Sequence, residues 1–155
     1  MTVRFRMPEG GTRDIVGFVL GSDVDTVTVL DRRGAEHVVP LADIVAGHEV
    51  PVSRGRDPRR MPTDLLDRMA ERTGVAGRRL VIRVADLLEG LESPALVETP
   101  EIATVDGEWV TADPGEPLVE VAWWAARQGA RSMQVRTDDP DEVAGLLARG
   151  FTELP

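Results

Sequence analysis

The chain has 155 residues, of which 42% are hydrophobic, and its formal net charge at pH 7 is −9. The hydrophobic fraction is sufficient for a folded core, so the composition excludes a disordered acidic protein. Cys and Tyr are absent, and apart from two His every basic residue is Arg. Disulfides, a thiol nucleophile, cysteine-ligated zinc and a lysine Schiff base are therefore excluded, and a multi-histidine metal site is not expected.

Charge divides the chain into three parts. Residues 1–53 carry five Arg against eight acidic residues, residues 54–83 carry nine Arg against four, and residues 84–155 carry four Arg against fifteen. This division predicts a basic middle segment between two acidic modules. No apolar run is long enough to cross a bilayer and no leader peptide is recognisable, so we expect a cytoplasmic protein without a membrane partner.

The first 52 residues predict a small β-barrel. Alternating apolar and polar positions indicate strands at residues 3–6, 14–21, 25–31 and 35–40, and a fifth at the end of residues 40–52. Gly34 is placed for a turn position with positive φ, and the chain is expected to turn through Leu41 to Asp43. Five short strands without helices favour closure, because a closed barrel has no exposed edge strand.

Residues 53–62 are rich in Pro and Arg and predict a linker. A helix is expected to follow, capped by Thr63 or Asp64 and ended by Gly74. Its apolar side is formed by Leu65, Leu66 and Met69.

Residues 63–155 predict an α/β unit with a mixed sheet, since strands and helices alternate. Strands are expected at residues 78–84 and 131–137, a short helix at 85–93, and a hairpin around the turn Asp106-Gly107. In the second of these strands Met133 and Val135 are expected to point inward.

Two further helices complete the predicted unit. Asp113 and Glu116 are the capping candidates for the helix that carries Trp123 and Trp124. In the last helix, Asp139 predicts the N-cap, with Pro140 at the first position and Glu142 completing a capping box. The residues expected to face the core are Val143, Leu146 and Leu147, and Gly150 ends the helix.

The chain resembles the N-terminal portion of actinobacterial GNAT-family acetyltransferases. Residues 3–21 and 38–52 are similar to the Src-homology-3-like barrel that precedes the catalytic part of some of these enzymes, and residues 123–151 are similar to the final helix, strand and helix of a GNAT domain. The resemblance implies the fold class α+β: a barrel at 1–52, a linker at 53–62, and a degenerate, partial GNAT-like domain at 63–155.

The residues that the resemblance assigns to catalysis are missing. The family binds the acetyl-CoA pyrophosphate on a loop of an Arg or Gln followed by small residues at a helix N-terminus. The nearest stretch, residues 71–77, has Glu71 in place of the cation and is expected to end a helix at Gly74. The Tyr that serves as general acid is absent, and the chain is expected to be too short for the central pair of strands that splays around the cofactor.

The remaining candidates concern interaction. Trp123 and Trp124 are adjacent on a helix and point about 100° apart, so one is expected to pack on the sheet and the other to lie at a boundary or contact surface. Four Arg of the linker are candidates for contact with nucleic-acid phosphates or with the acidic C-terminal module: Arg54, Arg56, Arg59 and Arg60. His37 and His48 are interpreted as strand residues.

The interpretation that we prefer is a non-catalytic interaction or regulatory protein without a catalytic residue, cofactor or metal. A half sheet leaves an edge to be covered, so we expect a homodimer or a permanent partner protein. One alternative is an acetyl-CoA-dependent N-acetyltransferase completed by a second protomer, with Glu120, Asp138 or Asp139 as base. Another is a nucleic-acid-binding small-barrel protein.

Overall fold

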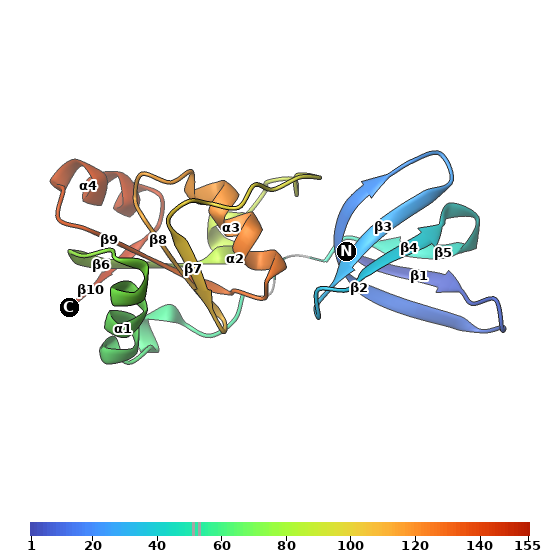
Figure 1. The fold of residues 1–155 in the computed structure, drawn as a ribbon, viewed down its shortest axis with the longest axis horizontal. Helices are drawn as coiled ribbons and strands as arrows, with labels where there is room; N and C mark the ends of the chain where they lie inside the picture. Colours follow the sequence, from blue (N-terminus) through green and yellow to red (C-terminus); the bar gives the residue numbers. More distant parts are fainter. Residues whose placement is uncertain (51, 53) are drawn as a thin grey trace. The chain divides into compact units, whose positions relative to one another are not determined.

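The computed structural model describes residues 1–50, 52 and 54–155, so Pro51 and Ser53, at the predicted boundary between barrel and linker, lie outside it. The chain divides into two compact units, Met1–Pro51 with Glu92–Leu96, and Val52–Leu91 with Val97–Pro155. The fold is mixed α+β, with one five-stranded sheet in each unit (Figure 1). None of the helices in the described part is long and apolar enough to cross a membrane.

The first unit is an antiparallel sheet of five strands, and all five were predicted. Its strands are β1 (Thr2–Arg6), β2 (Thr12–Ser22), β3 (Thr26–Asp31), β4 (Glu36–Pro40) and β5 (Ile44–His48), in the order β4-β3-β2-β1-β5. The predicted turn between the last two strands is a 3-10 helix, η1 (Leu41–Asp43). No pairing joins β4 to β5 within the described residues, so a closed barrel is not shown.

Strand β2 changes partner halfway along its length. Its first part pairs with β1 up to Val16, and its second part pairs with β3 from Gly17 onward. A Cβ atom built on Gly17 would lie 1.9 Å from the carbonyl oxygen of Leu30. Only glycine therefore permits the close backbone approach at which β2 passes from one partner to the other.

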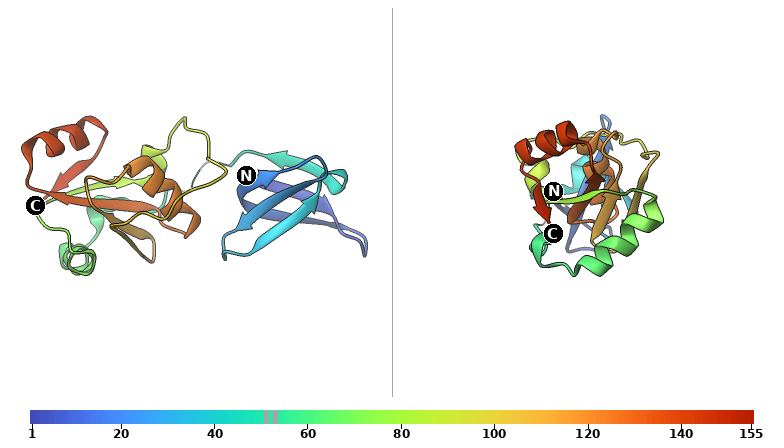
Figure 2. Two further views of the ribbon diagram at one scale, coloured as in Figure 1. Left: turned by 45° about the horizontal axis from the view of Figure 1, so that its top comes forward. Right: turned by 90° about the vertical axis from the view of Figure 1, so that its left-hand side faces the viewer.

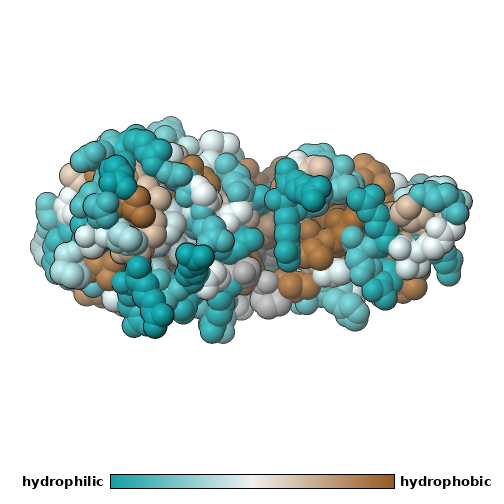
Figure 3. Space-filling model, turned by 90° about the horizontal axis from the view of Figure 1, so that it is seen from below, coloured by the Kyte–Doolittle hydropathy of each residue, from teal (hydrophilic) through white to brown (hydrophobic). Residues whose placement is uncertain are grey.

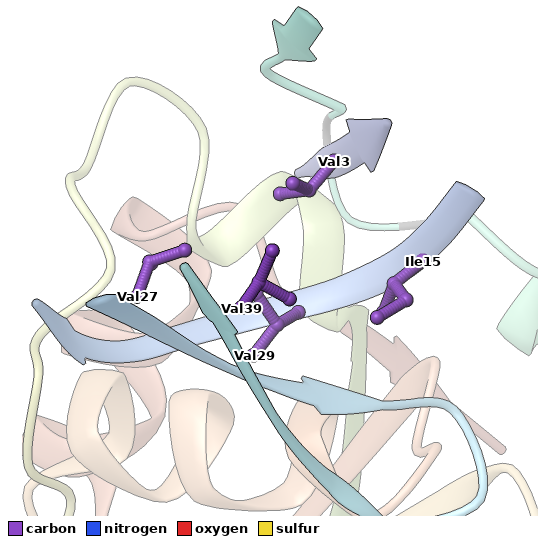
Figure 4. Close-up of a cluster of buried hydrophobic side chains, with 5 residues drawn as sticks. All are labelled: Val3, Ile15, Val27, Val29 and Val39. Atoms are coloured by element: carbon purple, nitrogen blue, oxygen red, sulfur yellow. The ribbon is translucent and has the colours of Figure 1, made fainter. Parts of the chain in front are cut away.

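Aliphatic side chains from four strands form the core of the first unit (Figure 4). The period-two alternation of β-strands places them on one face of the sheet. The buried cluster consists of Val3, Ile15, Val27, Val29 and Val39. The prediction that Val27 and Val29 point to the same side is confirmed.

The second unit is a sheet with helices on both faces. Its elements are η2 (Pro58–Arg60), α1 (Thr63–Thr73), β6 (Arg78–Arg83), α2 (Val84–Leu87), β7 (Ala103–Asp106), β8 (Trp109–Ala112), α3 (Leu118–Arg127), β9 (Ser132–Thr137), α4 (Pro140–Ala148) and β10 (Thr152–Leu154). Helix α1 lies on one face, and α3 and α4 lie on the other (Figures 1 and 2).

The order of the second sheet is β10-β6-β9-β8-β7, and β8 and β9 are its parallel pair. The sheet is therefore mixed, as predicted. The expectation that the chain lacks the splayed central pair of the GNAT family stays a prediction. The two strands pair from Trp109↔Ser132 through Ala112↔Val135.

Helix α1 begins at Thr63, its N-cap is Pro62, and no side chain caps it. The predicted capping by Thr63 or Asp64 is wrong, because these are already the first two residues of the helix. Gly74 ends the helix with φ 77°, in the left-handed region, as predicted.

The hairpin turn and the helix after β6 differ from their predictions. Asp106 pairs with Trp109, so the two-residue turn is Gly107-Glu108, one residue later than predicted. Gly107 has φ 58°, which the first central position of a type II′ turn requires. The predicted helix over residues 85–93 ends at Leu87, giving a four-residue α2.

Helix α4 has the predicted N-cap, since Asp139 accepts hydrogen bonds from the amides of Asp141 and Glu142. The reciprocal bond of a capping box does not form. The Thr137 hydroxyl instead donates to Glu142 Oε2 and accepts from the Asp139 amide. Leu147 is 44% exposed and does not belong to the buried stripe, whereas the two other residues predicted for it are buried.

Candidate functional site

The sheet of the second unit has a polar face beneath α1. Directly paired residues point to the same face, and Val81 pairs with Gln134, which pairs with Thr111. Val81 and Trp109 pack with Leu66 of α1, so this row faces α1. The residues on this face are Arg79, Val81, Arg83, Trp109, Thr111, Ser132, Gln134 and Arg136. The opposite face is apolar and carries Leu80, Ile82, Val110, Met133 and Val135.

Gln134 is the centre of a buried hydrogen-bond network. Its Nε2 donates to the carbonyl oxygen of Leu66 at 2.9 Å and to Thr111 Oγ1 at 2.8 Å. Its Oε1 accepts a longer bond from Arg136 Nε at 3.4 Å. The side chain is completely buried, and all of its polar atoms are engaged. It therefore ties α1 to two strands of the sheet.

Two arginines share one carboxylate at the edge of this network. Asp67 Oδ1 accepts from Arg136 Nη2 at 2.6 Å and from Arg79 Nη2 at 2.7 Å. The bonds from Arg79 first, and then Arg136, lower the pKa of Asp67. The Arg79 Nε is buried and has no hydrogen-bond partner among the described residues. The carboxylate is thus held ionised, and its bonds to the two arginines hold α1 against the sheet.

A cavity of about 170 Å³ lies near the junction of β6 and β10. Thr152, the first residue of β10, pairs with Val81 of β6. Ile82 and Arg83, the last two residues of β6, therefore extend beyond the part that pairs with β10. The cavity is lined by Asp57, Pro58, Arg59, Val81, Ile82, Arg83, Asp86, Gly150 and Thr152. Its charged lining residues are Asp57, Arg59, Arg83 and Asp86.

The charged side chains at the cavity form two groups, one around Asp57 and one around Asp86. Asp57 accepts from Arg59 Nε at 3.0 Å and Nη2 at 2.9 Å. These bonds, the Arg59 amide and the charge of Arg83 lower the pKa of Asp57 to about 2. Asp86 is 3.1 Å from Arg54 Nη2 and 3.7 Å from Arg83 Nη1. The Asp57 carboxylate is therefore held ionised by its arginine partner, and Asp86 contacts two arginines.

The four arginines predicted as interaction residues do not form one surface group. Arg54 and Arg59 are paired with Asp86 and Asp57, and Asp57 also caps η2 through the Arg59 amide. The segment packs on β6, with Pro58 buried. Arg56 and Arg60 are exposed, and no ion pair joins either to another described residue.

Trp123 and Trp124 differ in burial as predicted. Trp123 is buried at 6% exposure, and Trp124 is half-buried. Both lie on α3, which packs on β8. Their role in contacts with another molecule stays a prediction.

The loop that joins β8 to α3 is acidic and bonded within itself. The Gly115 amide donates to Asp113 Oδ1 at 2.9 Å, and the Glu116 amide donates to the Asp113 carbonyl at 3.2 Å. Glu116 Oε1 accepts from the Ile102 amide at 2.6 Å. The predicted capping of α3 by Asp113 or Glu116 is wrong, because its N-cap is Pro117.

The three predicted bases have different surroundings. Glu120 is exposed in the first turn of α3. Asp138 accepts from the Arg78 amide at 3.2 Å, and Asp139 is occupied as the N-cap of α4. The structure does not bring the three together with the cavity near β10.

His37 belongs to the first unit and contacts one carboxylate. Its Nε2 lies 2.9 Å from Asp31 Oδ2, and Asp31 also accepts from the amides of Arg33 and Ala35. These bonds, with His37 the largest cause, lower the pKa of Asp31 to about 2. Gly34 has φ 79° in the same turn, as predicted. The pair therefore stabilises the turn between β3 and β4.

The sequence reasoning missed the polar face of the second sheet. Part of its signal was present in the sequence, because Gln134 and Arg136 alternate with Met133 and Val135 in the strand at residues 131–137. The strand at residues 78–84 shows no such alternation, since Leu80, Val81 and Ile82 are consecutive apolar residues. The carboxylate that pairs with Arg79 and Arg136 is Asp67, which lies on the helix predicted to follow the linker.

Comparison of the chain with protein-family models, curated proteins and solved structures finds no match. The relationship to GNAT acetyltransferases therefore stays a prediction from the sequence. Across residues 1–50, 52 and 54–155, no three His, Asp or Glu side chains come together as a group that could hold a metal ion.

Proposed function

We propose that this protein is a non-catalytic interaction or regulatory protein related to GNAT acetyltransferases. The observation that carries the proposal is the loop between β8 and α3, the connection that follows the first strand of the parallel pair. In a strand–helix arrangement of this kind, such a loop is where backbone amides at a helix N-terminus bind phosphate.

The charge and hydrogen bonding of this loop oppose such binding. Asp113 and Glu116 place two carboxylates before the helix, and Glu120 adds a third in its first turn. The amides of Gly115 and Glu116 already donate within the loop. A diphosphate there would meet negative charge, and two amides would first have to lose their partners.

The parallel pair gives a second argument. β8 and β9 remain paired through Ala112↔Val135, at the end of β8. A cofactor inserted between the two strands would have to break this pairing.

The exposed aliphatic side chains of the first unit favour a role in contacts with another molecule. They include Val24, Val38, Leu41, Val45 and Val50, and brown residues gather on the visible face of this unit in Figure 3.

An acetyltransferase completed by a second protomer is the second candidate. The order α3, β9, α4, β10 favours it, since it is the arrangement that the sequence resemblance implies. Nucleic-acid binding is less favoured, because Arg54 and Arg59 already pair with carboxylates. Phe5 also packs against the core of its sheet rather than serving as a stacking platform.

We also assign the first unit to the Src-homology-3-like small barrels. The strand order β4-β3-β2-β1-β5, the change of partner along β2 and the 3-10 turn before β5 support this assignment.

Calorimetric titration with acetyl-CoA, and with coenzyme A carrying the same pyrophosphate, tests the proposal. We expect no binding heat at micromolar concentrations. Micromolar affinity for either ligand would overturn the non-catalytic role.

Light scattering after size-exclusion chromatography should show that the protein is a dimer. A monomer without acetyl-CoA affinity would eliminate the acetyltransferase candidate.

A further inference from the structure

Strand β4 lies at an edge of the first sheet and exposes an aliphatic side chain there. It pairs with β3 and with no second strand in the described part of the chain. Val39 belongs to the core, so the residues on either side of it, Val38 and Pro40, point to the outer face, as does Glu36. All three are exposed, and Val38 is 65% exposed. An exposed edge of this kind is available for pairing with a further strand.

The hydrogen-bond pattern shows which backbone groups of β4 point outward. Ala35, just before the strand, accepts from the last residue of β3, and Leu41, just after it, donates to the residue that precedes β3. Bonded and non-bonded positions alternate along an antiparallel ladder, so every second residue from Ala35 to Leu41 is bonded to β3. The amides and carbonyls of Glu36 and Val38, and the carbonyl of Pro40, therefore point away from β3.

These outward groups are complementary to the same groups of a second copy. In an antiparallel pair centred on Val38, the two Val38 residues exchange both of their backbone bonds. Each Glu36 amide then donates to the Pro40 carbonyl of the other copy. Pro40 has no amide, so only the Glu36 carbonyl is left to water. On the outer face, Val38 lies beside its own copy, and Glu36 lies beside Pro40 rather than beside another carboxylate.

The charges at the two ends of β4 favour the antiparallel arrangement. Arg32 and Arg33 lie in the turn before the strand, and Asp25 and Asp43 lie near its other end. None of the four takes part in an ion pair within the described residues. Asp31, in the same turn as the arginines, is already bonded within the unit. An antiparallel copy therefore places the free arginines of each strand beside the free carboxylates of the other.

We propose that β4 is the dimer interface of this protein, and that its partner is β4 of a second copy, paired antiparallel about Val38. The first sheets of the two copies then form one continuous sheet. The proposal rests on the proposed interaction role, for which it names the surface and the partner.

Sedimentation velocity of the whole protein over a concentration series tests the interface. We expect a reversible monomer–dimer equilibrium in the micromolar range, because the pairing of two short edge strands buries little area. Val38→Glu places two carboxylates against each other at the centre of the interface and should raise the dissociation constant about tenfold or more. The matched control is Val45→Glu, at a 49% exposed position on β5, the other edge strand of the sheet, and it should leave the constant unchanged.

A cross-linking measurement keeps the test available if Val38→Glu does not fold. The chain has no Cys, so Val38→Cys introduces a single thiol. A short bismaleimide should link this variant into a covalent dimer and should link Val45→Cys much less at the same concentration.

Four outcomes would overturn the proposal: a monomer at every concentration, an assembly larger than a dimer, a dimer that Val38→Glu does not weaken, or equal cross-linking at the two positions. Acetyl-CoA binding by a protein that dimerises through β4 would overturn the non-catalytic role and leave this interface standing.

Discussion

Gln134 is an unusual side chain for the middle of a sheet, since it is uncharged, polar and completely buried. Its amide satisfies the Leu66 carbonyl and the Thr111 hydroxyl, and it accepts from Arg136. The cost of burying an amide is offset only while these bonds are made. The position therefore tolerates Gln but should not tolerate an apolar residue of similar size.

Replacement of Gln134 by Leu should lower the free energy of unfolding of the second unit by about 2 kcal/mol, because buried acceptors and donors lose their partner. Denaturant unfolding followed by Trp fluorescence measures the change, since Trp109, Trp123 and Trp124 all belong to this unit.

The matched control is Gln128→Leu, at an exposed position just after α3, which should change stability by no more than about 0.5 kcal/mol. Equal effects of the two substitutions would show that the buried network adds nothing to stability.

At the scale of elements, Gly17 explains how one continuous strand serves two partners. The alternation of β2 predicted a strand, but no local pattern marked Gly17 as the position where its pairing changes. Such a contact depends on the carbonyl of Leu30, which is distant in sequence. Sequence periodicity therefore predicts the existence of the strand and not its close approach to a neighbour.

Gly17→Ala should destabilise the first unit by about 1–3 kcal/mol, because the added methyl group overlaps the Leu30 carbonyl and backbone must shift. Gly21→Ala is the matched control in the same strand, since its Cβ would meet no atom within 4 Å. Far-UV circular dichroism during denaturation measures both. An equal stability of the two variants would contradict the close approach at Gly17.

The same contrast holds for helices and for the candidate site. Asp139 was recognisable as a cap because its partners are two and three residues away. The bonds of Thr137 to Glu142 and to the Asp139 amide were not recognisable from the sequence, because they depend on how β9 leads into α4. Likewise, Arg83 and Asp86 are close in sequence, but Asp57 and Gly150 reach the same cavity from opposite ends of the unit.

At the scale of the whole molecule, each unit has a buried hydrophobic cluster of its own. One cluster belongs to the first sheet, and the cluster of Leu66, Val81 and Trp109 belongs to the second. Each unit has its own complete sheet. A chain of this kind need not unfold in a single cooperative step.

We expect two unfolding transitions by circular dichroism and one by Trp fluorescence. Gln134→Leu should shift the transition seen by fluorescence, and Gly17→Ala should shift only the other. If both variants move one common transition, the two sheets unfold as a single cooperative structure and this expectation is wrong.

The position of β6 between β9 and β10 affects how the second sheet is made. During translation, β6 leaves the ribosome first, but both of its neighbours follow β7 and β8 in the chain. Until β10 emerges, one flank of β6 is open to pairing with a nascent strand from a neighbouring ribosome. Overexpression at high ribosome density should therefore favour co-translational aggregation through β6, and slower synthesis should reduce it.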